Sequence, residues 1–158
     1  MAELTPFQTV GPYLSIGLRA GIQAAGEGGE IAISGRLLDG AGQPIPDGIL
    51  EWWHPSLATV LRSTTEDEGR FVVRTIKPRV DSGGGAPHLA LRVLARGILT
   101  QYVTRVYFDD EPGTPDDPVL RLVPPARRHT LIATRESANA YRFDVIVQGD
   151  HETVFFDV

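Results

Sequence analysis

Cysteine is absent from the 158 residues of this chain. The absence excludes disulfide bonds, thiolate metal sites and cysteine nucleophiles, and it favours a reducing compartment, so we expect the cytoplasm. Long apolar runs are absent too, since no stretch approaches the roughly 18 apolar residues of a membrane-spanning helix. Residues 1–6 (MAELTP) contain no basic segment followed by an apolar run, which argues against an export signal. Neither secretion nor membrane insertion is expected.

Positive charge is scarce in this sequence. Fifteen lysines and arginines stand against twenty aspartates and glutamates, for a net charge of −5. This balance repels nucleic-acid phosphates unless a strong basic patch compensates. The only basic cluster is 127–129 (RRH), whereas phosphate binding needs several cations along one stripe. We therefore expect no nucleic-acid partner and no membrane partner.

Complete catalytic and metal-binding motifs are missing as well. There is no Gly-x-Ser-x-Gly nucleophile elbow, and the glycine-rich segments 26–29 and 83–85 do not lead into a Gly-Lys-Ser phosphate loop. A metal site usually shows at least one closely spaced pair of ligands. No two of the four histidines lie within five residues of each other: His54, His88, His129 and His151. The sequence predicts a chain with no complete site of its own.

Short runs of residues that favour β-strands make up most of the rest of the sequence. A chain of this length fits one domain with one core, here residues 1–158. Seventeen glycines and twelve prolines are spread as punctuation between apolar runs. This layout is typical of an all-β sandwich or barrel. The expected strands, rich in β-branched and aromatic residues, are 30–34, 49–53, 71–75, 88–95, 104–108, 141–148 and 153–158.

Turns, a loop and one short helix are expected between these strands. The helix is predicted over 116–122, with Asp116 or Asp117 as its N-cap and Pro118 in its first turn. Pro124 and Pro125 should end it. Tight turns are predicted from their Asp, Glu and Gly residues at 39–44 and 65–70, and a flexible loop at 81–85.

Three segments suggest a role beyond packing. Residues 9–13 (TVGPY) place a turn and an aromatic ring in an N-terminal arm. Such arms are usually disordered unless something holds them, and a partner surface could do so. Arg96 stands beside Gly97 at a strand end, where it can receive a carboxylate or form an ordinary surface ion pair. The tail 152–158 (ETVFFDV) ends on adjacent phenylalanines, so it is expected to be a core strand or an interface strand.

The order of these motifs resembles the intradiol ring-cleaving dioxygenases. The resemblance runs through almost the whole chain, and Arg96, Arg105 and the Phe-Phe-Asp tail are its most specific parts. It implies a transthyretin-like Greek-key β-sandwich with a short helix and long loops. The motifs that carry it are 9–13, 39–47, 51–53, 75–78, 86–88, 95–97, 104–110, 127–133, 141–144 and 152–157.

The iron ligands of that family are mostly missing here. Catalytic chains of the family hold non-haem Fe(III) with two tyrosines and two histidines, the latter spaced His-x-His. His88 matches the first histidine, but Ala90 stands at the second position. No tyrosine occurs in 79–82 or between Trp53 and Gly69, where the other ligands would lie. One histidine cannot replace this set.

The resemblance is therefore to the α-type subunits of the family, which leave the Fe(III) to a homologous β subunit. It implies a higher hetero-oligomer in which residues 1–25 form an arm on the partner. The implied reaction is cleavage of protocatechuate by O2, between its hydroxyl-bearing carbons, to 3-carboxy-cis,cis-muconate. Matched residue by residue, this chain would supply part of the substrate-binding wall through Thr9, Gly11, Pro12 and Arg96. The segment 54–69 looks shorter than in the family.

Two alternatives from other classes remain open. The first is a non-catalytic β-sandwich module of the transthyretin-like or carboxypeptidase-regulatory-like type, which the segment 35–40 (GRLLDG) fits equally well. It does not explain Arg96 or the block 104–110. The second is a self-contained enzyme with a rebuilt metal site, drawn from His54, His88 or His129 with Tyr13 or Tyr107.

Overall fold

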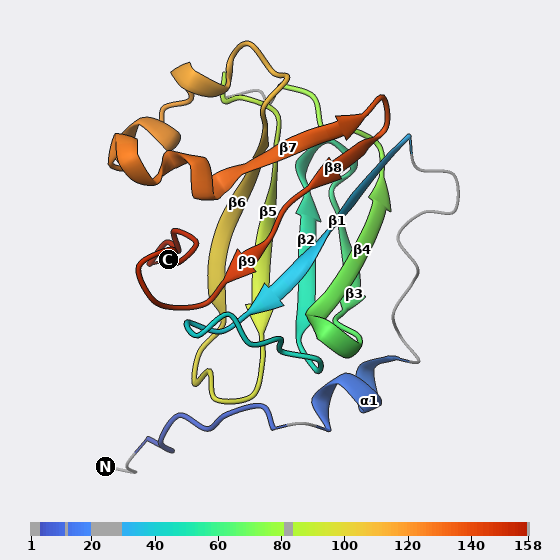
Figure 1. Ribbon diagram of the computed structural model, residues 1–158, viewed down its shortest axis with the longest axis vertical. Coiled ribbons are helices and arrows are strands. Elements are labelled where there is room, and N and C mark those ends of the chain that lie inside the picture. The colour runs from blue at the N-terminus through green and yellow to red at the C-terminus, as the bar shows by residue number, and fades with distance from the viewer. Residues whose placement is uncertain (1–3, 12, 20–29, 81–83, 158) are drawn as a thin grey trace.

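The structure is a computed structural model that describes residues 4–11, 13–19, 30–80 and 84–157. Nine strands form a sandwich of two layers (Figure 1). Their bounds are β1 Ile31–Leu38, β2 Ile49–His54, β3 Thr59–Thr64, β4 Arg70–Thr75, β5 His88–Leu94, β6 Tyr102–Phe108, β7 Ile132–Ser137, β8 Ala140–Arg142 and β9 Val145–Ile146.

The two layers are joined along one side. The strand order is β3-β2-β5-β6-β7-β8-β1-β4, and β9 pairs with β1. The first layer, β3-β2-β5-β6, is antiparallel throughout. The second layer contains β7, β8, β1 and β4, and a short parallel pairing of β6 with β7 links the layers. Because β1 and β2 lie in different layers, the chain passes from one layer to the other between them.

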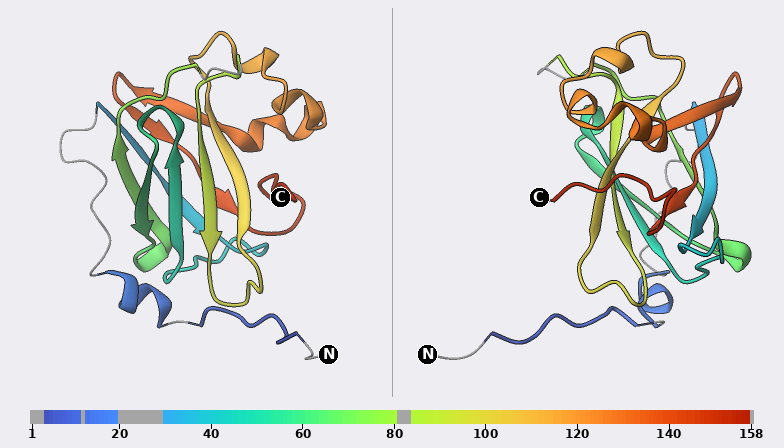
Figure 2. Two further views of the ribbon diagram at one scale, coloured as in Figure 1. Left: turned by 180° about the vertical axis from the view of Figure 1, so that it is seen from behind. Right: turned by 60° about the vertical axis from the view of Figure 1, so that its left-hand side comes forward.

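Alternation of side chains builds the core between the layers. In β1 every second residue is buried, from Ile31 to Leu37. Trp52 from the first layer is fully buried and its ring lies 5.7 Å from that of Phe71 in the second layer. This period of two puts one face of each strand in the core and leaves the other free. The left view of Figure 2 looks onto the free face of the first layer.

The prediction of an all-β sandwich is confirmed, and five of the seven expected runs coincide with strands β1, β2, β4, β5 and β6 to within a few residues. Strands β3 and β7 were not predicted. In β7 only Ala133 is buried and the last four residues are exposed, so there is no alternation to detect. The segment 59–64 belongs to the stretch 54–69 that looks shorter than in the family, yet it pairs with β2 along its whole length.

Two expected strands are wrong in detail. The run 141–148 divides into β8 and β9, because the Asp144 carboxylate accepts a hydrogen bond from the Arg36 backbone N–H (2.8 Å) in place of a backbone carbonyl. The tail is not a strand. It makes a single bridge, from the Phe156 N–H to the Val103 carbonyl (2.7 Å). Its rings are nevertheless partly buried, and Phe155 packs 4.7 Å from Tyr102.

The predicted helix at 116–122 is also wrong. Single 3-10 turns lie at Thr114–Asp116 and Leu120–Leu122. Asp117 does act as a cap, because its Oδ1 accepts hydrogen bonds from Val119 N and Leu120 N, both at 2.9 Å. Three helical segments were not expected: an α-helix α1 at Leu14–Arg19, a 3-10 turn at Pro55–Leu57 and a 3-10 helix at Pro125–Leu131.

The predicted turns lie where expected. Asp39 Oδ1 accepts from Ala41 N and Gln43 N, and the positive φ falls on Gly42 rather than Gly40. The turn at 65–70 contains the 3-10 segment Asp67–Gly69. The expected loop 81–85 lies outside the described residues except at 84 and 85. Among the described residues no helix is both long and apolar enough to cross a membrane.

Candidate functional site

Arg96 stands on a tight turn that ends β5. The Ala95 carbonyl accepts a hydrogen bond from Ile98 N at 3.2 Å, and Gly97 has φ of 83°. A positive φ at the third position is the mark of a type II turn, which favours glycine there. Arg96 therefore occupies the second position, at the corner of the turn. Its side chain is about half exposed, at 53%.

The N-terminal arm lies against this turn. Thr9 Oγ1 accepts a hydrogen bond from Gly97 N at 2.8 Å, although the two residues are 88 positions apart. Gly11 follows with φ of 68°, a conformation that suits glycine. The structure thus brings Thr9 and Arg96 to the same end of the sandwich. Pro12 lies outside the described residues.

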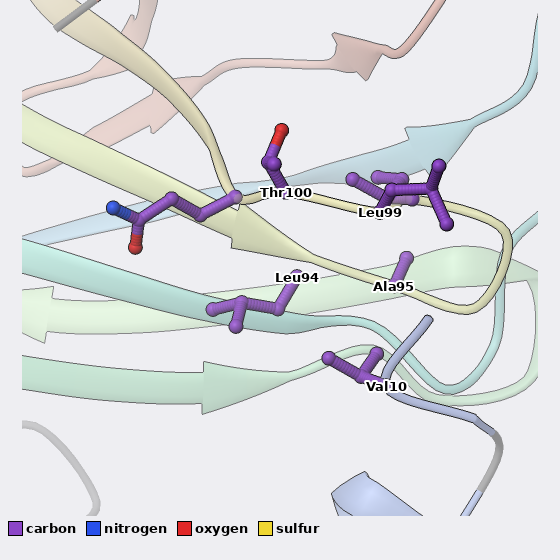
Figure 3. A pocket seen from close by; sticks show the side chains of 7 residues that line it. Val10, Leu94, Ala95, Leu99 and Thr100 are labelled. Atoms are coloured by element: carbon purple, nitrogen blue, oxygen red, sulfur yellow. The ribbon is translucent and has the colours of Figure 1, made fainter. Parts of the chain in front are cut away.

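A small hollow lies between the arm and the turn. Its volume is about 180 Å³, and Figure 3 shows Val10 on the side of the arm with Leu94, Ala95 and Leu99 opposite. Ligand pockets commonly have volumes of about 300–1,000 Å³. The hollow is therefore too small to be a complete ligand pocket by itself.

Asp47 is the ionic partner of Arg96. Arg96 Nε lies 3.1 Å from Asp47 Oδ2, and the Asp47 side chain is 13% exposed. Sequence reasoning missed this residue. Its position at the end of the motif 39–47 gave a hint, but no local pattern relates it to Arg96.

His88, the residue that resembles the first histidine of the family, lies away from the Arg96 turn. His88 begins β5, at the end of that strand opposite to Arg96. Its side chain is buried, with Nδ1 2.9 Å from the Ala86 carbonyl and its ring 5.5 Å from that of Tyr107. The structure therefore does not bring His88 together with Arg96.

Ala90 lies on the outer face of the first layer. Its register partners are Trp53 on β2 and Arg105 on β6. Because its side chain is a single methyl group, it leaves a groove of about 460 Å³, lined by Glu51, Trp53, Val60, Ala90, Arg92 and Val103. A second histidine at position 90 would project into this groove. Position 90 instead carries a methyl group, which cannot bind a metal.

Tyr107, the nearest tyrosine to His88, has a structural partner. Its hydroxyl donates to Asp117 Oδ1 at 2.8 Å. Burial and this hydrogen bond raise the pKa of Tyr107 far above its ordinary value, against the opposing effect of Arg105. Burial alone would raise the pKa of Asp117, but hydrogen bonds from Leu120 N, Tyr107 and other donors outweigh it and lower that pKa. A neutral phenol in this arrangement is a poor ligand for Fe(III).

The metal-binding side chains in the described part of the chain do not form a site for the Fe(III) of the family. Within the described ranges, no three His, Cys, Asp or Glu side chains lie close enough together to hold a metal ion. His54 cannot join such a set as it stands. Its Nδ1 accepts from Leu57 N (3.2 Å) and its Nε2 lies 3.0 Å from the Ile76 carbonyl, to which it donates. Both ring nitrogens are therefore engaged in hydrogen bonds to backbone groups.

Comparison with known proteins identifies close relatives. No protein-family profile matches the chain. It is 39% identical to the protocatechuate 3,4-dioxygenase alpha chain of Burkholderia cepacia over 98% of this chain and 97% of that one. For the alpha chain of Pseudomonas putida the identity is 37%, over 97% and 96%. The Burkholderia alignment spans 191 positions against the 158 residues here, so that relative contains segments absent from this chain.

A beta chain and two solved structures are also similar to this chain. The chain is 27% identical to the protocatechuate 3,4-dioxygenase beta chain of B. cepacia, over 80% of this chain and 67% of that one. A dioxygenase domain from Streptomyces sp. SirexAA-E superposes with a TM-score of 0.61 at 23% identity, covering 75% of this chain and 79% of that one. Catechol 1,2-dioxygenase from Acinetobacter sp. ADP1 gives 0.60 at 16%, covering 86% and 59%.

These structural likenesses support the sandwich fold, and the two alpha chains carry the closer relationship. Both exceed 35% identity and align almost from end to end. The chain belongs to the protocatechuate 3,4-dioxygenase alpha-chain family of the intradiol dioxygenases.

Proposed function

We propose that this chain is the α subunit of a protocatechuate 3,4-dioxygenase and forms one wall of an active site whose Fe(III) is held by a homologous β subunit. The observation that carries the proposal is the separation of two features. The Arg96 turn is built and anchored by Thr9 and Asp47, whereas the position matching the second iron-binding histidine is Ala90.

The chain's own residues would recognise the substrate. Protocatechuate carries a carboxylate, and a guanidinium presents two parallel N–H donors to such a group. Arg96 is held near the surface and half exposed, so its charge is available to a ligand. Thr9 and Gly11 place the arm beside it, and we assign the same role to Pro12 from its position in the motif. The hollow at Val10 is too small alone, which fits a cavity completed by a second subunit.

Assembly with the β subunit would use the N-terminal arm. The arm exposes large apolar side chains that do not pack on the rest of the described chain: Leu4 at 95%, Phe7 at 75% and Tyr13 at 79% exposure. Exposure of several large apolar side chains on one segment is typical of an interaction surface. A beta-chain relative with detectable identity supports pairing of two homologous subunits. We place residues 1–25 on the partner, in a higher hetero-oligomer that works in the cytoplasm.

Co-expression tests the proposal directly. The chain would be purified alone and together with the homologous chain from its own genome that carries His-x-His, and iron content and protocatechuate-dependent O2 uptake would be measured. We expect iron and ring cleavage to 3-carboxy-cis,cis-muconate in the complex only. A lone chain that binds stoichiometric iron would overturn the proposal and favour the self-contained enzyme. Failure of the two chains to co-purify would favour the non-catalytic β-sandwich module.

A further inference from the structure

The carboxylate of Asp47 is buried without a hydrogen bond. Both of its oxygens are inaccessible to solvent, and neither accepts a hydrogen bond from any described residue. The nearest cation is the Arg96 guanidinium, 3.1 Å away through Nε, a distance that allows an ion pair although the N–H is not aimed at the oxygen. Burying a charge in this way is costly unless an opposite charge compensates. The Asp47 charge is therefore stabilised chiefly by Arg96.

The segment around Asp47 is held rigidly. Thr65, which is fully buried, accepts from Gly48 N at 2.8 Å and donates to the Ile45 carbonyl at 2.6 Å through the same hydroxyl. A Cβ at Gly48 would lie 2.4 Å from Leu37 Cδ2, so the backbone is packed closely there. Asp47 lies between these two anchored residues. Its carboxylate consequently remains beside Arg96 instead of turning to solvent.

The contact with Asp47 uses only one edge of the guanidinium. It is made by Nε, the nitrogen nearest the backbone, and the described residues provide no other ion pair or hydrogen bond to this side chain. The two terminal nitrogens are therefore left for a ligand. A carboxylate can bind both of them, since the guanidinium forms a planar fork. Asp47 fixes the direction of that fork while leaving its outer end open.

We propose that Asp47 is a positioning residue for substrate recognition, which orients Arg96 toward the carboxylate of the incoming aromatic acid. The inference rests on the proposed function, in which Arg96 faces the substrate. An arginine held in place before binding loses less side-chain entropy when the ligand arrives. The benefit appears in the affinity for carboxylate-bearing ligands. It does not appear in the rate of ring opening, because neither residue touches the carbons that react.

The test uses the co-purified α–β complex and O2 uptake. Asp47→Asn keeps the shape of the side chain and removes its charge. We expect it to raise KM for protocatechuate about three- to tenfold, the size of one ion pair at a partly exposed site, with kcat and iron content unchanged. In the double variant with Arg96→Ala, the Asp47 change should add nothing further, because its effect passes through Arg96.

A second measurement separates positioning from a structural role. Catechol lacks the carboxylate, so its inhibition constant against protocatechuate turnover should not change in Asp47→Asn. Asp47→Ser removes the same charge with a smaller side chain and should reproduce the KM effect if the Asn variant assembles poorly. The matched control is Arg121→Ala, which removes the exposed ion pair with Asp116 on the 3-10 turns and should leave KM unchanged.

Three results would overturn the inference. The first is a rise in the catechol inhibition constant equal to the rise in KM. The second is full additivity of Asp47→Asn and Arg96→Ala, and the third is no effect of Asp47→Asn or Asp47→Ser where Arg96→Ala raises KM. If Arg96→Ala itself leaves KM unchanged, the substrate role of Arg96 fails along with the inference. That outcome is distinct from failure of the proposed function, which would show as missing iron and activity in the wild-type complex.

Discussion

Nζ of Lys77 lies 2.8 Å from Oδ1 of Asp110 and joins the ends of two layers of the sandwich. Lys77 follows β4 and Asp110 follows β6, so the pair connects strands that are not neighbours in a sheet. The same Nζ reaches Glu111 at 2.6 Å, and the Tyr141 hydroxyl donates to Asp110 Oδ2 at 3.0 Å. Only 22% of the Lys77 side chain is exposed. Lys77, Asp110, Glu111 and Tyr141 form one polar cluster, the clasp, which connects the two layers at this end of the molecule.

Loss of the clasp should weaken the fold at neutral pH. Lys77→Met leaves two carboxylates without their common cation, and we expect the free energy of unfolding in urea at pH 7 to fall by about 1–2 kcal/mol. Arg70→Met serves as control, because Arg70 pairs with Glu68 on the open surface. It should change that free energy by no more than about 0.5 kcal/mol.

The loss of unfolding free energy in Lys77→Met should depend on pH. Burial pushes the pKa of Asp110 upward, but the hydrogen bonds from Lys77 and Tyr141 outweigh it, and the pKa lies below its ordinary value. A lowered folded pKa means that the stabilisation is present at neutral pH and is lost as the pH falls through the folded pKa. The difference between Lys77→Met and the wild type should therefore shrink in acid. A difference that stays constant down to acid unfolding would contradict this.

His54 should prove structural. Replacing this fully buried residue with phenylalanine leaves Leu57 N and the Ile76 carbonyl without their partners. Both groups are only partly buried and each lost hydrogen bond costs about 0.5–1.5 kcal/mol, so His54→Phe should lower the free energy of unfolding by about 1–3 kcal/mol. The exposed His129→Phe is the control and should have little effect. Iron content of the complex should be the same in both variants, and a selective loss of iron in His54→Phe would point to a metal ligand.

Gly35 should tolerate no side chain. A Cβ there would lie 1.7 Å from the Phe143 carbonyl oxygen, where β1 passes the break between β8 and β9. Backbone cannot yield as a flexible side chain can, so we expect Gly35→Ala to lose at least about 3 kcal/mol of stability. Gly113→Ala, which meets nothing within 4 Å, should be neutral or slightly stabilising. Equal thermal midpoints for the two variants would contradict the close approach of Gly35 to Phe143.

Thr9 should control the contact between arm and turn. Thr9→Val keeps the shape but removes the acceptor of the Gly97 N–H. One such hydrogen bond contributes about 1 kcal/mol, so exchange of the Gly97 amide with deuterium should become about fivefold faster. Thr5→Val, an exposed position on the same arm, should leave that exchange rate unchanged. Unchanged protection in Thr9→Val would show that the arm does not rest on the turn in solution.

Much of the fold was predictable because the residues within each strand and turn determine its local conformation. Short runs rich in β-branched and aromatic residues predicted β1, β2, β4, β5 and β6, and the Asp-Gly and Glu-Gly segments predicted the turns at 39–44 and 65–70. Strand β7 escaped because it lies almost entirely at the surface. The predicted helix failed because Asp117 closes a single 3-10 turn, which the prolines on both sides keep from growing into an α-helix.

The sequence by itself determined which residue types are available to a site: it contains no cysteine and no closely spaced pair of histidines, and folding cannot supply side chains that the sequence lacks. Only the tertiary structure decided what surrounds Arg96. Thr9, Asp47 and Gly97 come from three separate segments, and their meeting depends on the crossing of the chain between layers and on the closure of the β5–β6 turn. Local patterns report the period of a strand and the shape of a turn. They contain no information on which distant carboxylate a turn will meet.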